Sequence, residues 1–262
     1  MTIKLQSVEL RVADVEGAAR FFAEVWGLTR VQNGVAVRLR GTAGLPYIIA
    51  LERGEPAIRS VTFCGTAAEI GHAREVQGPE GELYRFVVET PAAPLPASRD
   101  QPIELSHVVL NSKDVDEAER FAVETLGFKV SDRTRHMTFV RCNRTHHCIA
   151  YARAGFSSLN HIAFEMADLD AVMRGIGRMR DAGFAPVWGP GRHGPGNNVF
   201  GYFIGPHGGV IEYTAEVSQV GDDYKVGSPE DWKWPPGRND HWGVSARDNE
   251  RIGKAEQAFR WA

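Results

Sequence analysis

The sequence predicts an α+β fold made of two similar modules in tandem, and two observations support this. The chain repeats itself, and each copy shows strand-like alternation followed by apolar residues at helical spacing. An aspartate begins each predicted helix and a glycine ends it, as helix start and stop signals do. At an offset of 100 residues, Asp14–Val15 matches Asp114–Val115, Arg20–Phe21 matches Arg120–Phe121 and Gly27–Leu28 matches Gly127–Phe128, while the turn Pro79–Gly81 corresponds to Pro206–Gly208.

Each copy opens with an alternating strand, at Leu5–Val12 and at Ile103–Leu110, and the helix follows at once. A further helix is expected at Leu169–Ala182, ended by Gly183. The whole pattern predicts strand–helix–three-strand units that begin near Leu5, Arg59, Ile103 and Leu159. Further strands are expected at Gly34–Arg40, Tyr47–Arg53 and Leu83–Thr90 in the first copy, and at Lys129–Val130, His136–Arg141 and His147–Ala152 in the second.

We expect a first module at residues 1–92, a second at 103–218, and a C-terminal tail at 219–262. The proline-rich segment Pro91–Gln101 is typical of a linker. The tail is rich in tryptophan, proline and charge, and ends in a short helix. Its indoles, Trp232, Trp234 and Trp242, either cover an aromatic substrate or only pack the tail onto the second module.

Composition narrows the class of protein. A hydrophobic content of 43%, a charged content of 24% and a net charge of −3 are typical of a globular protein and give no reason to expect nucleic-acid or membrane partners. Three scattered cysteines do not make a disulfide framework, which fits a reducing cytoplasm. Neither a signal peptide nor a membrane span is expected, so the sequence predicts a cytoplasmic protein.

The two copies differ in one chemically important way. The second carries two histidines and a glutamate, each on an otherwise apolar predicted strand, where the first carries two serines and an arginine. A lone histidine on a strand is usually structural, and an internal Glu–His hydrogen bond is an alternative, but burying a carboxylate costs several kcal/mol unless it is paired or bound to a cation. We therefore predict a metal site in the second module. When the copies are overlaid, His107 falls on Ser7, His161 on Ser60 and Glu212 on Arg85.

This set of ligands indicates which metal is bound. Two histidines and one carboxylate form the ligand face typical of non-haem Fe(II) oxygenases, which leaves coordination positions open. Because the set holds nitrogen and oxygen but no thiolate, it suits Fe(II) or Mn(II) better than structural zinc.

The pattern of units resembles the vicinal oxygen chelate superfamily, which implies two modules that are each a partly open β-barrel. Within it, residues 103–216 resemble the catalytic module of type I extradiol ring-cleaving dioxygenases, and residues 1–90 their non-catalytic module. Three further residues carry this resemblance. His147 precedes an Ile-Ala-Tyr run fourteen residues before His161, while His193 and Tyr202 lie nineteen and ten residues before Glu212.

The resemblance implies an Fe(II)-dependent cleavage of a catechol by O2, next to the diol rather than between its hydroxyls. In that case His147 handles the proton of a substrate hydroxyl, Tyr202 hydrogen-bonds the chelated oxygen, and His193 is a further donor beside the substrate. A histidine is suited to this task because it titrates near neutral pH. A homo-oligomer is also expected.

Several alternatives stay open. His146 competes with His147 for the position at the metal, because neighbouring strand residues face opposite sides. Asn197 and Asn198 either donate to a substrate oxygen or form a turn. At the level of function, the alternatives are a metal-dependent isomerase or lyase of the glyoxalase kind, which needs a fourth ligand, and a metal-free binding protein of the resistance type. His136 and His207 are expected to be solvated or structural.

Overall fold

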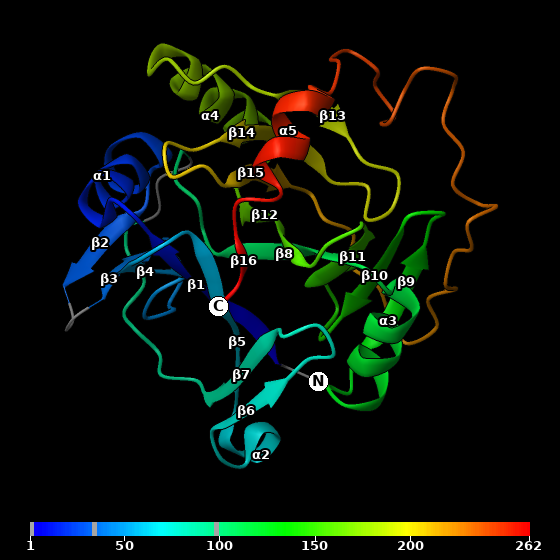
Figure 1. The fold of residues 1–262 in the computed structure, drawn as a ribbon, viewed down its shortest axis with the longest axis horizontal. Helices are drawn as coiled ribbons and strands as arrows, with labels where there is room; N and C mark the ends of the chain where they lie inside the picture. The colour runs from blue at the N-terminus through cyan, green and yellow to red at the C-terminus, as the bar shows by residue number, and fades with distance from the viewer. Residues whose placement is uncertain (1–2, 33–35, 97–99) are drawn as a thin grey trace.

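The computed structural model describes residues 3–32, 36–96 and 100–262, and contains two mixed sheets with few helices (Figure 1). The predicted α+β organisation in two modules is confirmed. The elements of the first module are β1 (Lys4–Val12), α1 (Val15–Arg20), the π-helix η1 (Phe21–Trp26), β2 (Thr29–Gln32), β3 (Val37–Arg40), β4 (Ile49–Arg53), β5 (Ala57–Gly65), α2 (Ala67–Ile70), β6 (Arg74–Gln77) and β7 (Leu83–Val88).

The second module repeats this order and extends it by one strand. A tail then leads to a short helix, as expected, and to a final strand. The elements are β8 (Leu105–Ser112), α3 (Val115–Glu124), β9 (Lys129–Arg133), β10 (Met137–Arg141), β11 (Ile149–Arg153), β12 (Ser158–Glu165), α4 (Leu169–Asp181), β13 (Trp188–Arg192), β14 (Val199–Ile204) and β15 (Val210–Ala215), followed by α5 (Asn249–Ala255) and β16 (Arg260–Trp261).

The predicted ends of the repeated helices follow local rules. The carboxylates of Asp14 and Asp114 accept hydrogen bonds from the backbone nitrogens of Gly17 and Glu117, and so satisfy N–H groups that the first helical turn leaves free. Gly27 follows the first helical stretch with φ of +98°, in the left-handed region that favours glycine.

Three local expectations need correction or lie outside the described residues. The second unit, which begins at β5, has only two strands after its short helix α2, so the three-strand expectation is wrong there. The eighth strand of the first sheet is instead β16, which pairs in parallel with β5. Part of the expected strand Gly34–Arg40 and part of the linker Pro91–Gln101 fall on residues 33–35 and 97–99, outside the described residues.

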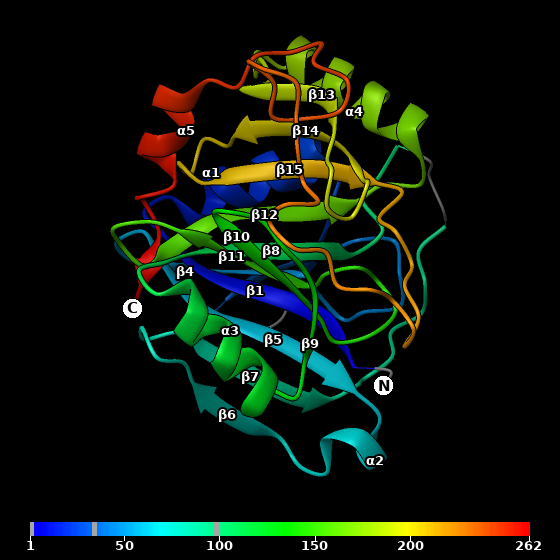
Figure 2. The ribbon, with the colours of Figure 1, turned by 90° about the vertical axis from the view of Figure 1, so that its right-hand side faces the viewer.

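Both sheets are open, because the strands at their ends do not pair with each other. The first runs β2-β3-β4-β1-β5-β7-β6, and the second runs β13-β14-β15-β12-β8-β11-β10-β9. Figure 2 shows the strands of both sheets stacked one above another, with β1 and β8 in the middle of the stack. This arrangement agrees with the partly open barrels that the sequence implies.

The register of the strands reproduces the overlay of the two copies. In the second sheet, Ala163 pairs with a histidine on β8 and with a glutamate on β15, and in the first sheet Thr62 pairs with a serine on β1 and with an arginine on β7. The two sites are therefore at equivalent places on equivalent strands. The paired residues are His107, Ala163 and Glu212 in one sheet, and Ser7, Thr62 and Arg85 in the other.

The two modules share one hydrophobic core. The indole of Trp26, at the end of η1, stacks on the ring of Tyr213 in β15 with centroids 3.6 Å apart. The buried hydroxyls of Tyr84 and Tyr151 lie 3.1 Å apart across the modules. Among the described residues, no helix is both long and apolar enough to cross a membrane.

Candidate metal centre

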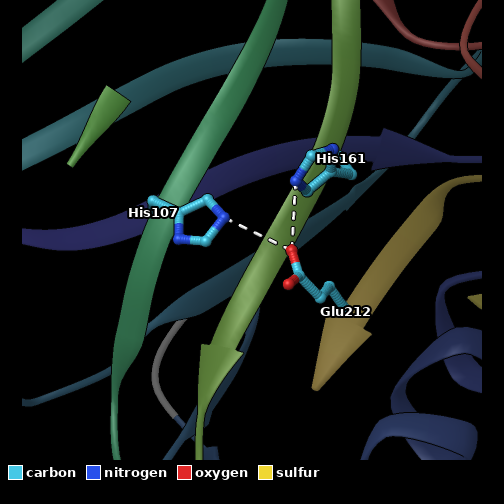
Figure 3. A group of neighbouring side chains, drawn as sticks. All are labelled: His107, His161 and Glu212. Atoms are coloured by element: carbon cyan, nitrogen blue, oxygen red, sulfur yellow. Dashed lines mark ion pairs between the residues drawn. The ribbon is translucent and has the colours of Figure 1, made fainter. Parts of the chain in front are cut away.

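The three predicted ligands meet on neighbouring strands at the centre of the second sheet (Figure 3). His107 lies on β8, His161 on β12 and Glu212 on β15, and their potential ligand atoms all lie within 4.8 Å of one another. Oε2 of Glu212 is 3.3 Å from Nε2 of His107 and 3.2 Å from Nε2 of His161. All three side chains are buried. The tertiary structure therefore brings together the residues that the sequence singled out.

Neighbouring oxygens orient both imidazoles. Oγ of Ser106 lies 3.2 Å from Nδ1 of His107, and Oδ1 of Asn160 lies 2.7 Å from Nδ1 of His161. Asn160 donates through Nδ2 to Oδ1 of Asn111, at 2.8 Å, which fixes the orientation of its amide. Contacts of this kind with the outer nitrogen commonly hold a ligand histidine in the tautomer that binds a metal through its other nitrogen.

The electrostatics of the triad fit a bound cation. Oδ1 of Asn160 can only accept, so Nδ1 of His161 carries the proton, and a neutral ring presents its Nε2 lone pair to Glu212. Oε2 of Glu212 is buried, and among the described residues it has no hydrogen-bond partner. The lone pairs of Nε2 of His161 and Oε2 of Glu212, which are 3.2 Å apart, repel each other unless a positive charge lies between them. A metal ion at this position would satisfy all three side chains.

The same environment keeps the carboxylate charged and the histidine neutral. Burial acts to raise the pKa of Glu212, but the two facing imidazoles lower it below its usual value. Burial is also the main cause of the lowered pKa of His107, although Glu212 opposes it. An ionised carboxylate and a neutral imidazole are the protonation states that bind a divalent ion.

The three residues predicted to be catalytic lie around the two histidines of this triad. The ring centroid of His147 is 4.2 Å from that of His107. On the other side, the hydroxyl of Tyr202 lies 3.0 Å from Nε2 of His193 and 3.4 Å from Nε2 of His161. His147 thus flanks one histidine of the triad, while Tyr202 and His193 flank the other.

Burial sets the charge states of His147, His193 and Tyr202. It lowers the pKa of His147 well below its usual value, with the neighbouring imidazoles adding to the effect, and lowers the pKa of His193 to about 4. Burial and the nearby Glu212 raise the pKa of Tyr202 well above 10. At neutral pH the two histidines are therefore uncharged, and the tyrosine keeps its proton as a hydrogen-bond donor.

Five of these six residues, all but Glu212, line one cavity of about 620 Å³. This volume is in the range of pockets that hold small organic ligands. Trp232 and Trp234 of the tail form part of its wall, but Trp242 does not; its ring instead contacts Arg192. The cavity is lined by His107, His147, His161, His193 and Tyr202, with Phe139, Trp188, Asn198, Trp232, Trp234 and Arg247 among the other residues.

The equivalent place in the first module holds an ion pair. Arg85 pairs through Nη1 with Oε2 of Glu9 and through Nε with Oε1 of Glu75, at 2.9 Å. Ser60 donates to the same oxygen of Glu9, at 2.8 Å. The guanidinium therefore supplies a positive charge where the second module has three potential ligands. This supports the prediction that the first module is scaffold.

The structure separates two of the alternatives that the sequence left open. Asn197 is in a turn, with φ of +52°, whereas Asn198 is buried and donates through Nδ2 to Oγ1 of Thr214, at 2.8 Å. The strand expected at His147–Ala152 begins only at Ile149 (β11), so His146 and His147 precede it and the alternation of a strand does not apply to them. His147 lines the cavity, and His146 lies behind it.

Two features of the site were missed by the sequence analysis. Asp132 on β9 was assigned no role, yet it is completely buried and accepts a hydrogen bond from His146. Trp188 was not singled out either, although its ring stacks on Tyr202 with centroids 5.2 Å apart. No sequence signal singled out Asp132, because Lys129 and Arg133 in the same strand are charged as well.

Comparison with known proteins agrees with this geometry. Residues 104–213 match the model of the Glyoxalase/Bleomycin resistance protein/Dioxygenase superfamily. This match covers most of the second module, so that part of the chain is similar to the superfamily that its sequence motifs indicated.

Two curated relatives match part of this chain. Metapyrocatechase 2 of Cupriavidus necator is 32% identical over 139 residues, which cover 52% of this chain and 41% of that protein. A 3-methylcatechol 2,3-dioxygenase of Pseudomonas putida is 31% identical over 132 residues, covering 47% of this chain and 45% of that protein. Each match spans less than half of the relative's length.

Similar folds occur among solved structures. The Mn(II)-bound glyoxalase of Novosphingobium aromaticivorans aligns with a TM-score of 0.83 and 29% identity, over 95% of this chain and 93% of that one. A variant of homoprotocatechuate 2,3-dioxygenase from Brevibacterium fuscum aligns with a TM-score of 0.81 and 22% identity, over 92% of this chain and 78% of that one. At 22% identity, the likeness to homoprotocatechuate 2,3-dioxygenase concerns the fold alone.

Proposed function

We propose that this protein is a metal-dependent extradiol dioxygenase, which opens the ring of a catechol-type aromatic diol with O2. The observation that carries the proposal is that two of the three potential ligands line the cavity. An ion held by His107, His161 and Glu212 would therefore lie at the cavity wall, where His147 and Tyr202 flank the two histidines. The names of the curated relatives point to the same chemistry.

The triad is proposed to hold Fe(II), with Mn(II) as the alternative ion. Three protein ligands would leave coordination positions free for the oxygens of a vicinal diol and for O2. The ion would act as a template and Lewis acid for the two substrates when bound. A closed structural site would instead surround the ion with four protein ligands.

The roles of the surrounding residues follow from their charge states. A diol has to lose a proton in order to chelate a metal, and His147 is uncharged at neutral pH and can accept it. Tyr202 keeps its proton and is placed to donate a hydrogen bond to a chelated oxygen. His193 holds the hydroxyl of Tyr202 through Nε2, at 3.0 Å. We therefore assign proton transfer to His147 and orientation of the substrate to Tyr202 and His193.

The cavity wall suits an aromatic ring. Trp188 stacks on Tyr202, and Phe139 packs edge-on against His147, with ring centroids 5.2 Å apart. Trp232 and Trp234 add further indole surface. Aromatic pairs of this kind contribute about 0.5–1.5 kcal/mol beyond the burial of area.

Metal analysis together with oxygen uptake tests the proposal. The protein is purified without oxygen, its iron and manganese are measured, and a panel of catechols is added with O2. We expect consumption of diol and O2 in equal amounts, with a ring-opened product. A protein that retains iron and consumes no diol in the panel would argue against the proposed reaction.

A second candidate is a metal-dependent isomerase or lyase of the glyoxalase kind. It is favoured by the likeness to the Mn(II)-bound glyoxalase, which extends over nearly all of both chains. Against it, only three residues group around one position in the described part of the chain, while such enzymes use a fourth ligand. Turnover of a glutathione hemithioacetal without O2 would support this candidate.

A further inference from the structure

Behind the cavity, three buried side chains form a continuous chain of hydrogen bonds. Nδ1 of His147 lies 3.0 Å from Nδ1 of His146, and Nε2 of His146 lies 2.7 Å from Oδ2 of Asp132. His146 and Asp132 are completely buried, and His147 is almost so. Nothing in this arrangement is needed to hold a metal, because Asp132 and His146 are not part of the triad.

The carboxylate of Asp132 determines which ring nitrogen carries the proton in each of the two histidines. Asp132 accepts from the backbone nitrogen of Gly227 at Oδ1, at 2.7 Å, and from the hydroxyl of Tyr224. A carboxylate only accepts, so Nε2 of His146 is the donor and a neutral His146 has a free lone pair at Nδ1. Nδ1 of His147 then donates to that lone pair. The remaining nitrogen of His147, Nε2, is left without a proton.

We propose that Asp132 and His146 are positioning residues that hold His147 in the tautomer with a free Nε2 directed at the substrate. The inference deepens the proposed function, on which it rests, by explaining how His147 acts as a base. It also gives His146 a role beside His147, where the alternation of a strand would have placed the two rings on opposite sides. The physical reason is that the two histidines precede β11, so both rings turn to the same side of the chain.

The proposal gives the tail a second role besides lining the cavity. Gly227 and Tyr224 belong to the segment after β15, which runs beside β9 (Figure 1). Asp132 and Gly227 also form an isolated bridge between these two segments. Burial and Asp132 raise the pKa of the Tyr224 hydroxyl to about 12, so it remains a donor. The tail thus fixes the carboxylate from which the orientation of His147 follows.

The substitution Asp132→Asn tests which nitrogens of His146 and His147 carry the protons. The backbone nitrogen of Gly227 keeps the amide oxygen at its side, so the amide nitrogen faces His146 and donates to its Nε2. His146 then donates through Nδ1, and the proton of His147 moves to Nε2. Asp222→Asn is the matched control, because Asp222 lies on the tail, its side chain is 92% exposed, and it pairs with Lys129 outside the cavity lining.

The first readout is the tautomer itself, measured by ¹⁵N NMR of the full chain loaded with diamagnetic Zn(II). We expect a proton on Nδ1 of His147 in the original protein and in Asp222→Asn, and on Nε2 in Asp132→Asn. Because no substrate is present, this result is independent of the proposed reaction. An unchanged tautomer in Asp132→Asn would overturn the inference even if the enzyme is a dioxygenase.

The second readout is turnover in a double-mutant cycle with His147→Asn. Asp132→Asn alone should lower kcat for a catechol about 100-fold, within the range for a lost general base, and leave KM and iron content nearly unchanged. In the His147→Asn background it should have no further effect. An equal loss in both backgrounds would show a structural role instead. Tyr224→Phe removes one donor to Asp132 and keeps the aromatic ring, and a several-fold loss of kcat is expected.

Discussion

Oδ1 of Asn160 lies 2.7 Å from Nδ1 of His161, and this contact determines which nitrogen of the histidine faces the metal position. Asn160→Leu removes the acceptor, so we expect metal affinity to fall by about 10- to 100-fold, the usual effect of losing such a partner. Asn160→Asp retains the acceptor for His161 but loses the donor to Asn111, so a smaller fall in metal affinity is expected. Competition with a chelator measures both. Equal loss in the two variants would exclude this role for Asn160.

Removal of any of the three ligands should abolish retention of the metal. His107→Ala, His161→Ala and Glu212→Ala each leave two protein ligands, too few to compete with water and buffer. The measurement is iron content after anaerobic purification, with circular dichroism as the check on folding. Ser7→Ala is the control at the equivalent place of the first module and should retain full iron content. Normal iron in one of the ligand variants would remove that residue from the site.

Loss of the proposed base should separate turnover from binding. His147→Asn should lower kcat by roughly 10²- to 10⁴-fold, the scale of a lost general acid or base, while iron content and catechol affinity change little. Stopped-flow measurement of catechol binding without O2, followed by mixing with O2, distinguishes the two steps. His72→Gln, an exposed histidine of the first module, is the control and should leave kcat unchanged.

The tail indoles can be tested one at a time. Deletion of the whole tail is unsuitable because α5 buries Ile252 and β16 pairs with β5, so the tail is part of the fold. Trp234→Ala removes an indole from the cavity wall and should raise KM for aromatic diols by about 2- to 10-fold, which corresponds to 0.5–1.5 kcal/mol. Trp242→Ala, outside the cavity, should leave KM unchanged. Equal KM in the two variants would show that Trp234 only packs the tail onto the second module and does not contact the substrate.

A buried histidine outside the site makes stability depend on pH. Burial among Phe21, Phe22 and Phe259 lowers the pKa of His207 from 6.5 to about 4. Because the folded pKa lies below the unfolded one, this neutral ring contributes fully above pH 6.5, and its contribution is lost as the pH falls towards 4. His207→Phe does not titrate, so the free energy of unfolding of the original protein should fall relative to this variant between pH 6.5 and 4. Urea unfolding at several pH values, on metal-free samples, measures the difference.

The sequence by itself determined the repeat, most of the elements and the three potential ligands. Alternation along a strand, an aspartate before a helix and a glycine after it act within a few residues, so they can be read without knowledge of the fold. His107, His161 and Glu212 were recognisable because each interrupts an apolar strand, and because the other copy supplies a comparison. The positions of His193 and Tyr202 beside the triad followed from the family resemblance.

The tertiary structure alone decided where His146 and His147 lie relative to the cavity, which residues the tail contacts and where the eighth strand of the first sheet comes from. Asp132 meets His146 and Gly227, and β16 meets β5, across separations along the chain that no local pattern encodes. A hydrogen bond between distant residues depends on where the intervening strands place them. For that reason the three potential ligands could be predicted from the sequence, while the contacts of His146 and Asp132 behind the cavity could not.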